Sequence, residues 1–249
     1  MYLKLFGRAL RHFLTRCVRR DRINAYERSV YSQNGEDGML HELFGRIGAP
    51  HRFFVEFGVE DGLECNTARL ARDFGWAGVL LEGSPEKFRA LDANYRPFSK
   101  VRRVEAFITR ENIVELFVAA GVPHEFDLLS IDIDGNDYWI WEALAAYAPR
   151  VVIIEFNATR PPPERWVIAY NPAHRWREDG YMGASLASLE ALGTRLGYVL
   201  LGTDEKGVNA IFVRRDLLAV CGFPARTALD AYHPTGYGFT KTDGPFEAV

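Results

Sequence analysis

The chain has 249 residues, of which 48% are hydrophobic and 25% are charged, and its formal net charge is −3. This length and composition fit one large globular domain or a domain with a short appendage. The three cysteines, Cys17, Cys65 and Cys221, lie far apart, which argues against a disulfide framework or a structural zinc site and favours a reducing compartment.

The first 28 residues differ from the rest of the chain in charge. They hold eight Lys or Arg residues against two acids, an excess of six positive charges, so the remaining chain carries a net −9. Such an acidic body does not favour a nucleic-acid-binding surface. Apolar residues recur at helical spacing within residues 1–30, with cationic residues between them, which predicts a separate basic amphipathic helix.

Two interpretations of this helix stay open. One is a peripheral contact with an anionic membrane surface, and the other is packing on its own domain or on a partner subunit, including a second copy of the chain. The helix is too charged to span a bilayer, and it lacks the uninterrupted apolar run of a signal peptide. The expected location is the cytoplasm, with this segment as the contact with the inner membrane face in the first interpretation.

Residues 31–249 are expected to form one domain in which short apolar strands alternate with amphipathic helices. Strands are predicted in chain order at 53–57, 78–81, 100–108, 126–133, 151–156, 198–201 and 209–214. Helices are predicted at 63–74, from 85 onward, from 109 to about 120, at 137–147 and at 185–196. The alternation predicts an α/β fold with a Rossmann-like, doubly wound, mostly parallel seven-stranded sheet that ends in an antiparallel hairpin strand. The stretch 157–183 breaks the rhythm, which indicates a substrate-binding or lid insert.

In sheets of this kind, ligands bind at the carboxyl ends of the strands. After the first strand, Glu56-x-Gly58-x-x-x-Gly62 indicates a cofactor turn, because glycine lets the backbone approach a ligand closely. Glu60 stands where a dinucleotide fingerprint has its second glycine, and its carboxylate disfavours a pyrophosphate. After the second strand, Glu82 is placed to accept hydrogen bonds from ribose hydroxyls.

Acids also follow the fourth and fifth strands. Asp132 and Asp134 lie after the fourth, and Glu155 and Asn157 lie after the fifth. Because these strands are expected to be neighbours, the four side chains would converge, and such oxygen ligands suit Mg²⁺ or another hard cation. The alternative is a hydrogen-bonded acidic cluster around the cofactor or the substrate.

Taken together, Glu56-x-Gly58-x-x-x-Gly62, Glu82, Asp132-Ile133-Asp134-Gly135 and Ile154-Glu155 resemble the S-adenosylmethionine-dependent class I methyltransferases. The resemblance is strongest to their FkbM-like branch, which includes sugar and polyketide O-methyltransferases, and it covers about residues 31–214. It implies the class I methyltransferase fold. Two features depart from the family pattern: the turn lacks its middle glycine, and no acid follows the third strand at Phe107-Ile108.

The resemblance implies roles for individual residues. Gly58 and Gly62 would form the turn beside the methionine part of the cofactor, Glu82 would hold the ribose, Phe107 would flank the adenine, and Gln33 would close over the cofactor. The full cofactor-binding set is Gln33, Glu56, Gly58, Gly62, Asn66, Glu82, Gly83, Ser84, Phe107 and Asp132. The metal set, which applies if the enzyme uses Mg²⁺ or another divalent cation, is Asp132, Asp134, Glu155 and Asn157.

The implied activity is O-methylation of a hydroxyl on a sugar, a glycan or a related small molecule. The in-line transfer requires alignment and a deprotonated hydroxyl, which a metal or a general base supplies. The catalytic candidates are Asp132, Asp134, His174 and His233. The aromatic residues of the insert suit either stacking on sugar faces or packing of a lid: Trp166, Tyr170, Trp176 and Tyr181.

Two other function classes are kept as alternatives. One is an NAD-dependent oxidoreductase, against which Glu60 and the terminal hairpin argue. The other is a non-catalytic, membrane-associated binding module that keeps the fold with a degenerate site.

Overall fold

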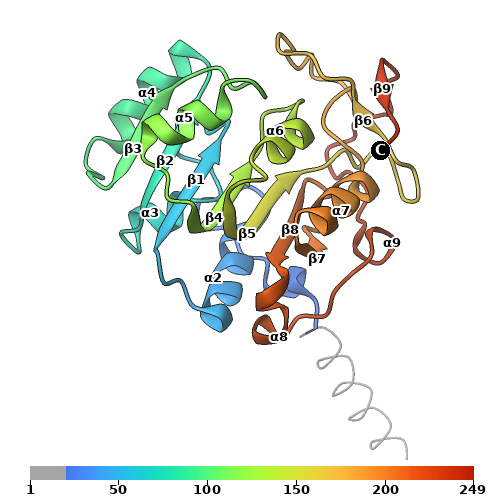
Figure 1. The fold of residues 1–249 in the computed structure, drawn as a ribbon, viewed down its shortest axis with the longest axis horizontal. Helices are drawn as coiled ribbons and strands as arrows, with labels where there is room; N and C mark the ends of the chain where they lie inside the picture. The colour runs from blue at the N-terminus through green and yellow to red at the C-terminus, as the bar shows by residue number, and fades with distance from the viewer. Residues whose placement is uncertain (1–20) are drawn as a thin grey trace, which may run out of the picture.

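The computed structural model describes residues 21–249. A seven-stranded sheet with the order β3-β2-β1-β4-β5-β8-β7 forms its centre (Figure 1). Its strands β8 and β7 are antiparallel to their neighbours, whereas the other neighbouring pairs are parallel. The predicted fold class is confirmed. The strands are β1 (Phe53–Phe57), β2 (Ala77–Glu82), β3 (Val101–Glu105), β4 (Glu125–Ile131), β5 (Ala148–Glu155), β7 (Tyr198–Thr203) and β8 (Asn209–Arg214).

Helices cover both faces of the sheet, as buried parallel strands require. One face packs on α5 (Ile113–Ala120), α6 (Asp137–Ala143) and α7 (Leu186–Arg195). The other packs on α2 (Glu36–Ile47), α3 (Ala68–Arg72), α4 (Pro85–Tyr95) and the short α8 (Leu218–Cys221). Residues of β5 alternate between the two cores, Val152 and Ile154 in the first and Val151 and Ile153 in the second.

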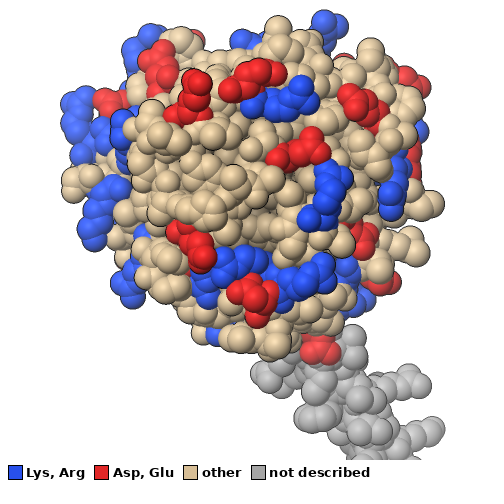
Figure 2. All heavy atoms as spheres, viewed as in Figure 1, with Lys and Arg blue, Asp and Glu red and all other residues tan. Residues whose placement is uncertain are grey.

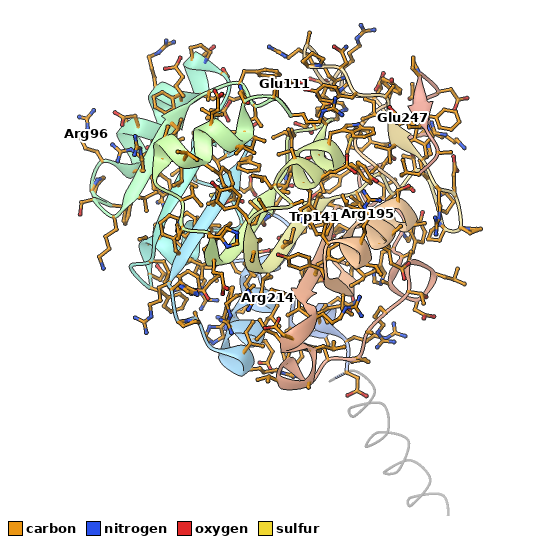
Figure 3. All side chains as sticks on the ribbon, viewed as in Figure 1. Arg96, Glu111, Trp141, Arg195, Arg214 and Glu247 are labelled. Carbon is orange, nitrogen blue, oxygen red and sulfur yellow. The ribbon has the colours of Figure 1, made fainter. Side chains whose placement is uncertain are left out.

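The contact between α6 and α7 holds the first layer together where Trp141 and Arg195 lie (Figure 3). The ring of Trp141 lies 4.9 Å from that of Phe212 on β8, measured between centroids. The guanidinium of Arg195 pairs with Glu142 at 2.5 Å. The helices are therefore fixed to each other and to the antiparallel end of the sheet.

Several element boundaries differ from the sequence prediction, and three of them bear on the candidate site. The helix predicted at 63–74 is only α3, because the amides of Asn66 and Thr67 donate to the carboxylate of Glu56 instead of opening a helix earlier. The strand predicted at 126–133 ends at Ile131, so the acids that follow it lie in a loop. The strand predicted at 100–108 ends at Glu105. The helix α2 was not predicted.

The insert 157–183 packs against residues 233–249, which we call the C-terminal tail. Strand β6 (Val167–Ile168) of the insert pairs with β9 (Phe246–Glu247) of the tail, beside the C-terminus (Figure 1). The guanidinium of Arg160 donates to the Thr242 carbonyl at 2.6 Å and pairs with Asp243. Trp166 is only 1% exposed, so this aromatic residue packs inside the protein instead of offering a face to a ligand. A short helix, α9 (Ala228–Ala231), precedes the tail.

Residues 1–20 of the predicted basic helix lie outside the described residues. The domain begins before the predicted boundary at residue 30, because the 3-10 helix η1 (Ile23–Tyr26) contacts both α2 and β7, and Ile23 is 1% exposed. Within residues 21–249, no helix is long and apolar enough to cross a membrane. On the face seen in Figure 2, basic and acidic side chains are interspersed.

Candidate active site

A cavity of about 240 Å³ opens at the carboxyl ends of β1, β2, β3 and β4, and we call it the strand-end cavity. This edge includes the switch in strand order between β1 and β4, where doubly wound sheets bind their ligands. Seven of the predicted site residues line the cavity. They are Gly58, Glu82, Gly83, Ser84, Phe107, Asp134 and His174.

The turn after β1 requires glycine for two different reasons. Gly58 has a φ of +66°, and a Cβ on it would lie 1.8 Å from the carbonyl oxygen of Asp132, so only glycine lets the two loops meet. Gly62 has a φ of +73°, and a Cβ there would lie 2.4 Å from the ring of Tyr95. The Tyr95 hydroxyl donates to the Gly62 carbonyl at 2.9 Å. Gly62 therefore packs on α4, whereas Gly58 faces the cavity.

Glu82 connects the first two strand ends. Its carboxylate accepts hydrogen bonds from the amides of Glu60 at 2.8 Å and Ser84 at 2.7 Å, and the side chain is 6% exposed. Each carboxylate oxygen keeps capacity for another donor, so a ligand hydroxyl can still bind there. The Ser84 hydroxyl accepts from the Lys87 amide and caps α4, as the sequence predicts.

The insert forms the outer wall of the cavity. The guanidinium of Arg175 lies 3.4 Å from the centroid of the Phe107 ring, a cation–π contact. His174 Nε2 lies 3.2 Å from the carbonyl oxygen of Asp134. A Cβ on Gly135 would come within 2.2 Å of the His174 ring, so the glycine after Asp134 lets the imidazole lie on the loop.

Asp132, Asp134 and Glu155 form a cluster, which we call the acid cluster. One carboxylate oxygen from each lies within 4.8 Å of the others. Burial and the neighbouring charges raise the pKa of Asp134 to about 6, and they raise the pKa values of Asp132 and Glu155 well above their usual range. Glu155 Oε2 is buried and has no hydrogen-bond partner among the described residues. Such a cluster binds a proton or a cation readily.

Asp137 has a structural task in the same loop. Its carboxylate accepts the amides of Ile133 at 2.8 Å and Gly135 at 2.9 Å, and α6 begins at this residue. Because these two loop amides donate to Asp137, they do not donate hydrogen bonds to the acid cluster. This agrees with the predicted start of a helix at residue 137.

Other candidates lie away from the strand-end cavity. Glu56 is 3% exposed and accepts from the Asn66 amide, the Thr67 amide and the Thr67 hydroxyl. The Asn66 side chain donates to the Ser130 hydroxyl at 3.1 Å. Gln33 is exposed and is not a lining residue. Glu56 and Asn66 thus build the turn whose backbone reaches the cavity.

Asn157 and His233 also serve local structure. The Asn157 amide nitrogen donates to the carbonyls of Gly180 and Met182, and its oxygen accepts from the Thr159 amide and hydroxyl. It therefore tethers the insert. His233 Nδ1 lies 2.9 Å from the Thr203 hydroxyl at the end of β7, and burial lowers its pKa. In the sheet, β8 lies between β7 and β5, so the strand that His233 contacts is not adjacent to the strand that carries Glu155.

Eight lining residues were not among the predicted site residues, and three of these have polar side chains that the sequence analysis did not discuss: Lys87, Asn136 and Arg175. Lys87 lies in the first turn of α4, and its ammonium pairs with Glu60 at 2.5 Å. The sequence shows that α4 begins at residue 85, so the position of Lys87 in the first turn of this helix could have been predicted. Arg175 comes from the insert, whose path across the sheet edge has no marker in the sequence.

The comparisons with known proteins concern the fold. No family model matches the chain, and the search of curated proteins found no match. Among solved structures, the SAH-bound N-terminal domain of EvdMO1 is 16% identical, covers 74% of this chain and 82% of its own, and has a TM-score of 0.49. An SAH complex of an O-methyltransferase from Bacillus cereus is 17% identical, with coverages of 74% and 82% and a TM-score of 0.48. The cofactor-bound Rv0187 from MTB is 22% identical, with coverages of 80% and 88% and a TM-score of 0.49. Likenesses at this level do not assign the chain to a family.

Proposed function

We propose that this chain is an S-adenosylmethionine-dependent O-methyltransferase of the FkbM-like branch, acting on a hydroxyl of a sugar, a glycan or a related small molecule. One observation carries the proposal: the strand-end cavity shares Asp134 with the acid cluster. A cofactor bound in the cavity would therefore lie beside groups that can bind or deprotonate an acceptor hydroxyl.

The charges of the cavity favour a sulfonium cofactor over a dinucleotide. Three acids line it, Glu60, Glu82 and Asp134, together with two permanent cations, Lys87 and Arg175. Because Lys87 already pairs with Glu60, the lining does not offer the excess of cations that a pyrophosphate requires. This weighs against the NAD-dependent alternative.

Different residues would contact different parts of S-adenosylmethionine. Gly58 would let the backbone approach the methionine part, the Glu82 carboxylate would accept the ribose hydroxyls, and the Phe107 ring would flank the adenine. Arg175 now covers that ring, so the guanidinium would have to move aside or stack on the outer face of the base. When bound, the cofactor supplies the methyl group, and alignment provides much of the rate.

We further propose that the acid cluster binds a divalent cation such as Mg²⁺. Three carboxylate oxygens within 4.8 Å of one another are a donor set that suits a hard cation. A cation there would offset the burial and the neighbouring negative charges that raise the pKa values of Asp132 and Glu155. It would also lower the pKa of a hydroxyl that approaches the cluster.

Isothermal titration with S-adenosylmethionine tests the cofactor. We expect saturable binding by the wild-type protein and at least a tenfold weaker affinity for Glu82→Ala. The matched control is Glu86→Ala, an exposed acid on α4 outside the cavity lining, which should stay within twofold of wild type. A wild-type protein that does not bind the cofactor would refute the proposal.

Thermal denaturation with and without Mg²⁺ tests the cation. The ion should raise the Tm of the wild-type protein by a few degrees and leave the Tm of Asp132→Asn unchanged. Asp73→Asn, an exposed aspartate at the end of α3, serves as the control and should respond like wild type. An equal response of all three proteins would place the ion elsewhere.

A further inference from the structure

Residues 170–175 of the insert form part of the outer wall of the strand-end cavity, and we call this segment the strap. Its last two residues, His174 and Arg175, line the cavity. The other lining residues come from the ends of β1, β2, β3 and β4 and from the segments that directly follow these strands. The strap therefore brings side chains to the cavity from a part of the chain that is distant in sequence.

The beginning of the strap is fixed to two different strand-end segments. The Tyr170 hydroxyl accepts the amide of Arg110 at 3.0 Å and donates to the carboxylate of Glu111, which follows β3 (Figure 3). The Asn136 side chain, which follows β4, donates to the Asn171 carbonyl at 2.8 Å. Because these bonds come from both sides, the strap backbone is held in place over the cavity.

The Arg175 side chain has fewer contacts than the backbone that carries it. Its guanidinium donates to the His174 carbonyl at 2.9 Å and lies 3.4 Å from the centroid of the Phe107 ring. Among residues 21–249 it forms no ion pair with a carboxylate, and the residue is exposed. The guanidinium can therefore change position while the strap stays where it is.

The Phe107 ring, by contrast, has a fixed seat. A Cβ on Gly83 would lie 3.1 Å from Cδ2 of this ring, so the ring packs closely on the loop after β2. Phe107 is 38% exposed, and Ala106 and Ile108 line the cavity beside it. The cavity thus offers an apolar, planar surface for an aromatic ring, and its wall also holds the Glu82 carboxylate that would accept the ribose hydroxyls.

We propose that Arg175 is a cofactor-binding residue whose guanidinium stacks on the outer face of the adenine, while the inner face of the base lies on Phe107. This assignment rests on the proposed methyltransferase function, and it adds a binding residue from the insert to the residues at the strand ends. Planar guanidinium groups stack on aromatic faces, and their charge strengthens the contact. The strap is then the segment that covers the base.

The contact between Arg175 and Phe107 defines the movement that binding requires. Carbon atoms in contact lie about 3.5 Å apart, so a base that enters between the two groups needs about one more interval of this size. Rotation about the bonds of the long arginine side chain can provide it without breaking the bonds that hold the strap backbone. The guanidinium exchanges one aromatic face for another, so its cation–π contact is replaced and not lost.

The opposite possibility is that Arg175 competes with the base for the face of Phe107. Removal of the side chain would then strengthen cofactor binding, because the face would be free. Stacking on the outer face predicts weaker binding, because the base would lose one of its two planar contacts. The direction of the change in affinity therefore distinguishes the two arrangements.

Isothermal titration with S-adenosylmethionine and S-adenosylhomocysteine tests the assignment. Arg175→Ala should raise the Kd at least about fivefold for both ligands, because they share the base and differ in the charge on sulfur. The matched control is Arg177→Ala, an exposed arginine of the same insert outside the cavity lining, which should stay within twofold of wild type. Without ligand, the Tm of Arg175→Ala should equal that of wild type, because the side chain is exposed. A fall of several degrees would give the side chain a structural role instead.

A conservative variant separates stacking from charge. Arg175→Lys keeps the positive charge but loses the planar group, so it should raise both Kd values at least about threefold. Wild-type affinity of this variant, an unchanged or lower Kd for Arg175→Ala, or a loss for only one of the two ligands would overturn this inference alone. Absence of S-adenosylmethionine binding by the wild-type protein would instead overturn the function on which it rests.

Discussion

Glu56 and the acid cluster are both buried carboxylates at strand ends, yet their surroundings are opposite. Four donors satisfy Glu56: the Asn66 amide, the Thr67 amide and hydroxyl, and the Ser130 hydroxyl at 3.1 Å. The acids of the cluster face one another, and Glu155 Oε2 has no partner among the described residues. The first environment holds a turn together, whereas the second places three carboxylates close to one another.

The supply of backbone amides explains the difference. The segment after β1 turns its amides toward Glu56, and this is why α3 starts only at Ala68. The loop after β4 gives its amides to Asp137 instead. A strand-end acid is therefore structural when the next segment bonds to it, and it is available for chemistry when that segment bonds elsewhere.

The largest expected effect is a difference in the free energy of unfolding between variants of these two carboxylates. Glu56→Ala would leave several buried donors without an acceptor and should lower the free energy of unfolding by about 3–5 kcal/mol. Glu155→Ala removes a carboxylate whose Oε2 has no hydrogen-bond partner among the described residues, and it relieves repulsion, so it should cost no more than about 1 kcal/mol. Urea denaturation at pH 7.5 with EDTA measures both. Similar losses for the two variants would contradict the distinction.

The next effect concerns pH. The pKa of Asp134 rises from its ordinary value of 3.8 to about 6 on folding, so the folded state binds more protons than the unfolded state between these values. Stability should therefore fall as the pH rises from about 4 through 6. Asp134→Asn should remove about 1–3 kcal/mol of this loss, after allowance for partial solvent screening.

Urea titrations of metal-free wild-type protein and Asp134→Asn at pH 4.5 and pH 7.5 measure this slope. Asparagine suits the position because the residue has a φ of +53°, which Asn tolerates well. Identical slopes for the two proteins would show that Asp134 keeps an ordinary pKa.

The smallest effect is expected for the exposed ion pair beside the strand-end cavity. The Lys87–Glu60 pair has side chains that are 50% and 66% exposed, so Lys87→Ala should change the free energy of unfolding by less than about 1 kcal/mol. The change should shrink further in 1 M NaCl. A larger loss in urea denaturation would show that charge near this turn matters for folding as much as the hydrogen bonds of Glu56.

Much of the fold was predictable because it depends on local patterns. The Val/Ile run of β5 can be buried on both faces only between two helical layers, and Ser84-Pro85 marks the start of α4 by capping chemistry. The cavity lining was predictable where a residue lies at a strand end or within three residues of it, as with Gly58, Glu82 and Asp134. Asn157 and His233 were chosen by residue type and position, but their hydrogen bonds depend on the insert and on β7, which lie far away in sequence.

The sequence by itself determined the alternation of strands and helices, the edge of the sheet at which polar residues gather and the acids near the ends of β4 and β5. Periodicity, capping and turn chemistry act over a few residues, so they can be seen in the chain. Only the tertiary structure decided which acids are satisfied, because donors reach Glu56 from Asn66, Thr67 and Ser130. It also decided that the insert and the C-terminal tail meet over the end of β5. Contacts between segments this far apart in sequence produce no periodic pattern in the chain. Which segments meet depends on the contacts that the whole folded chain gains when these loops close.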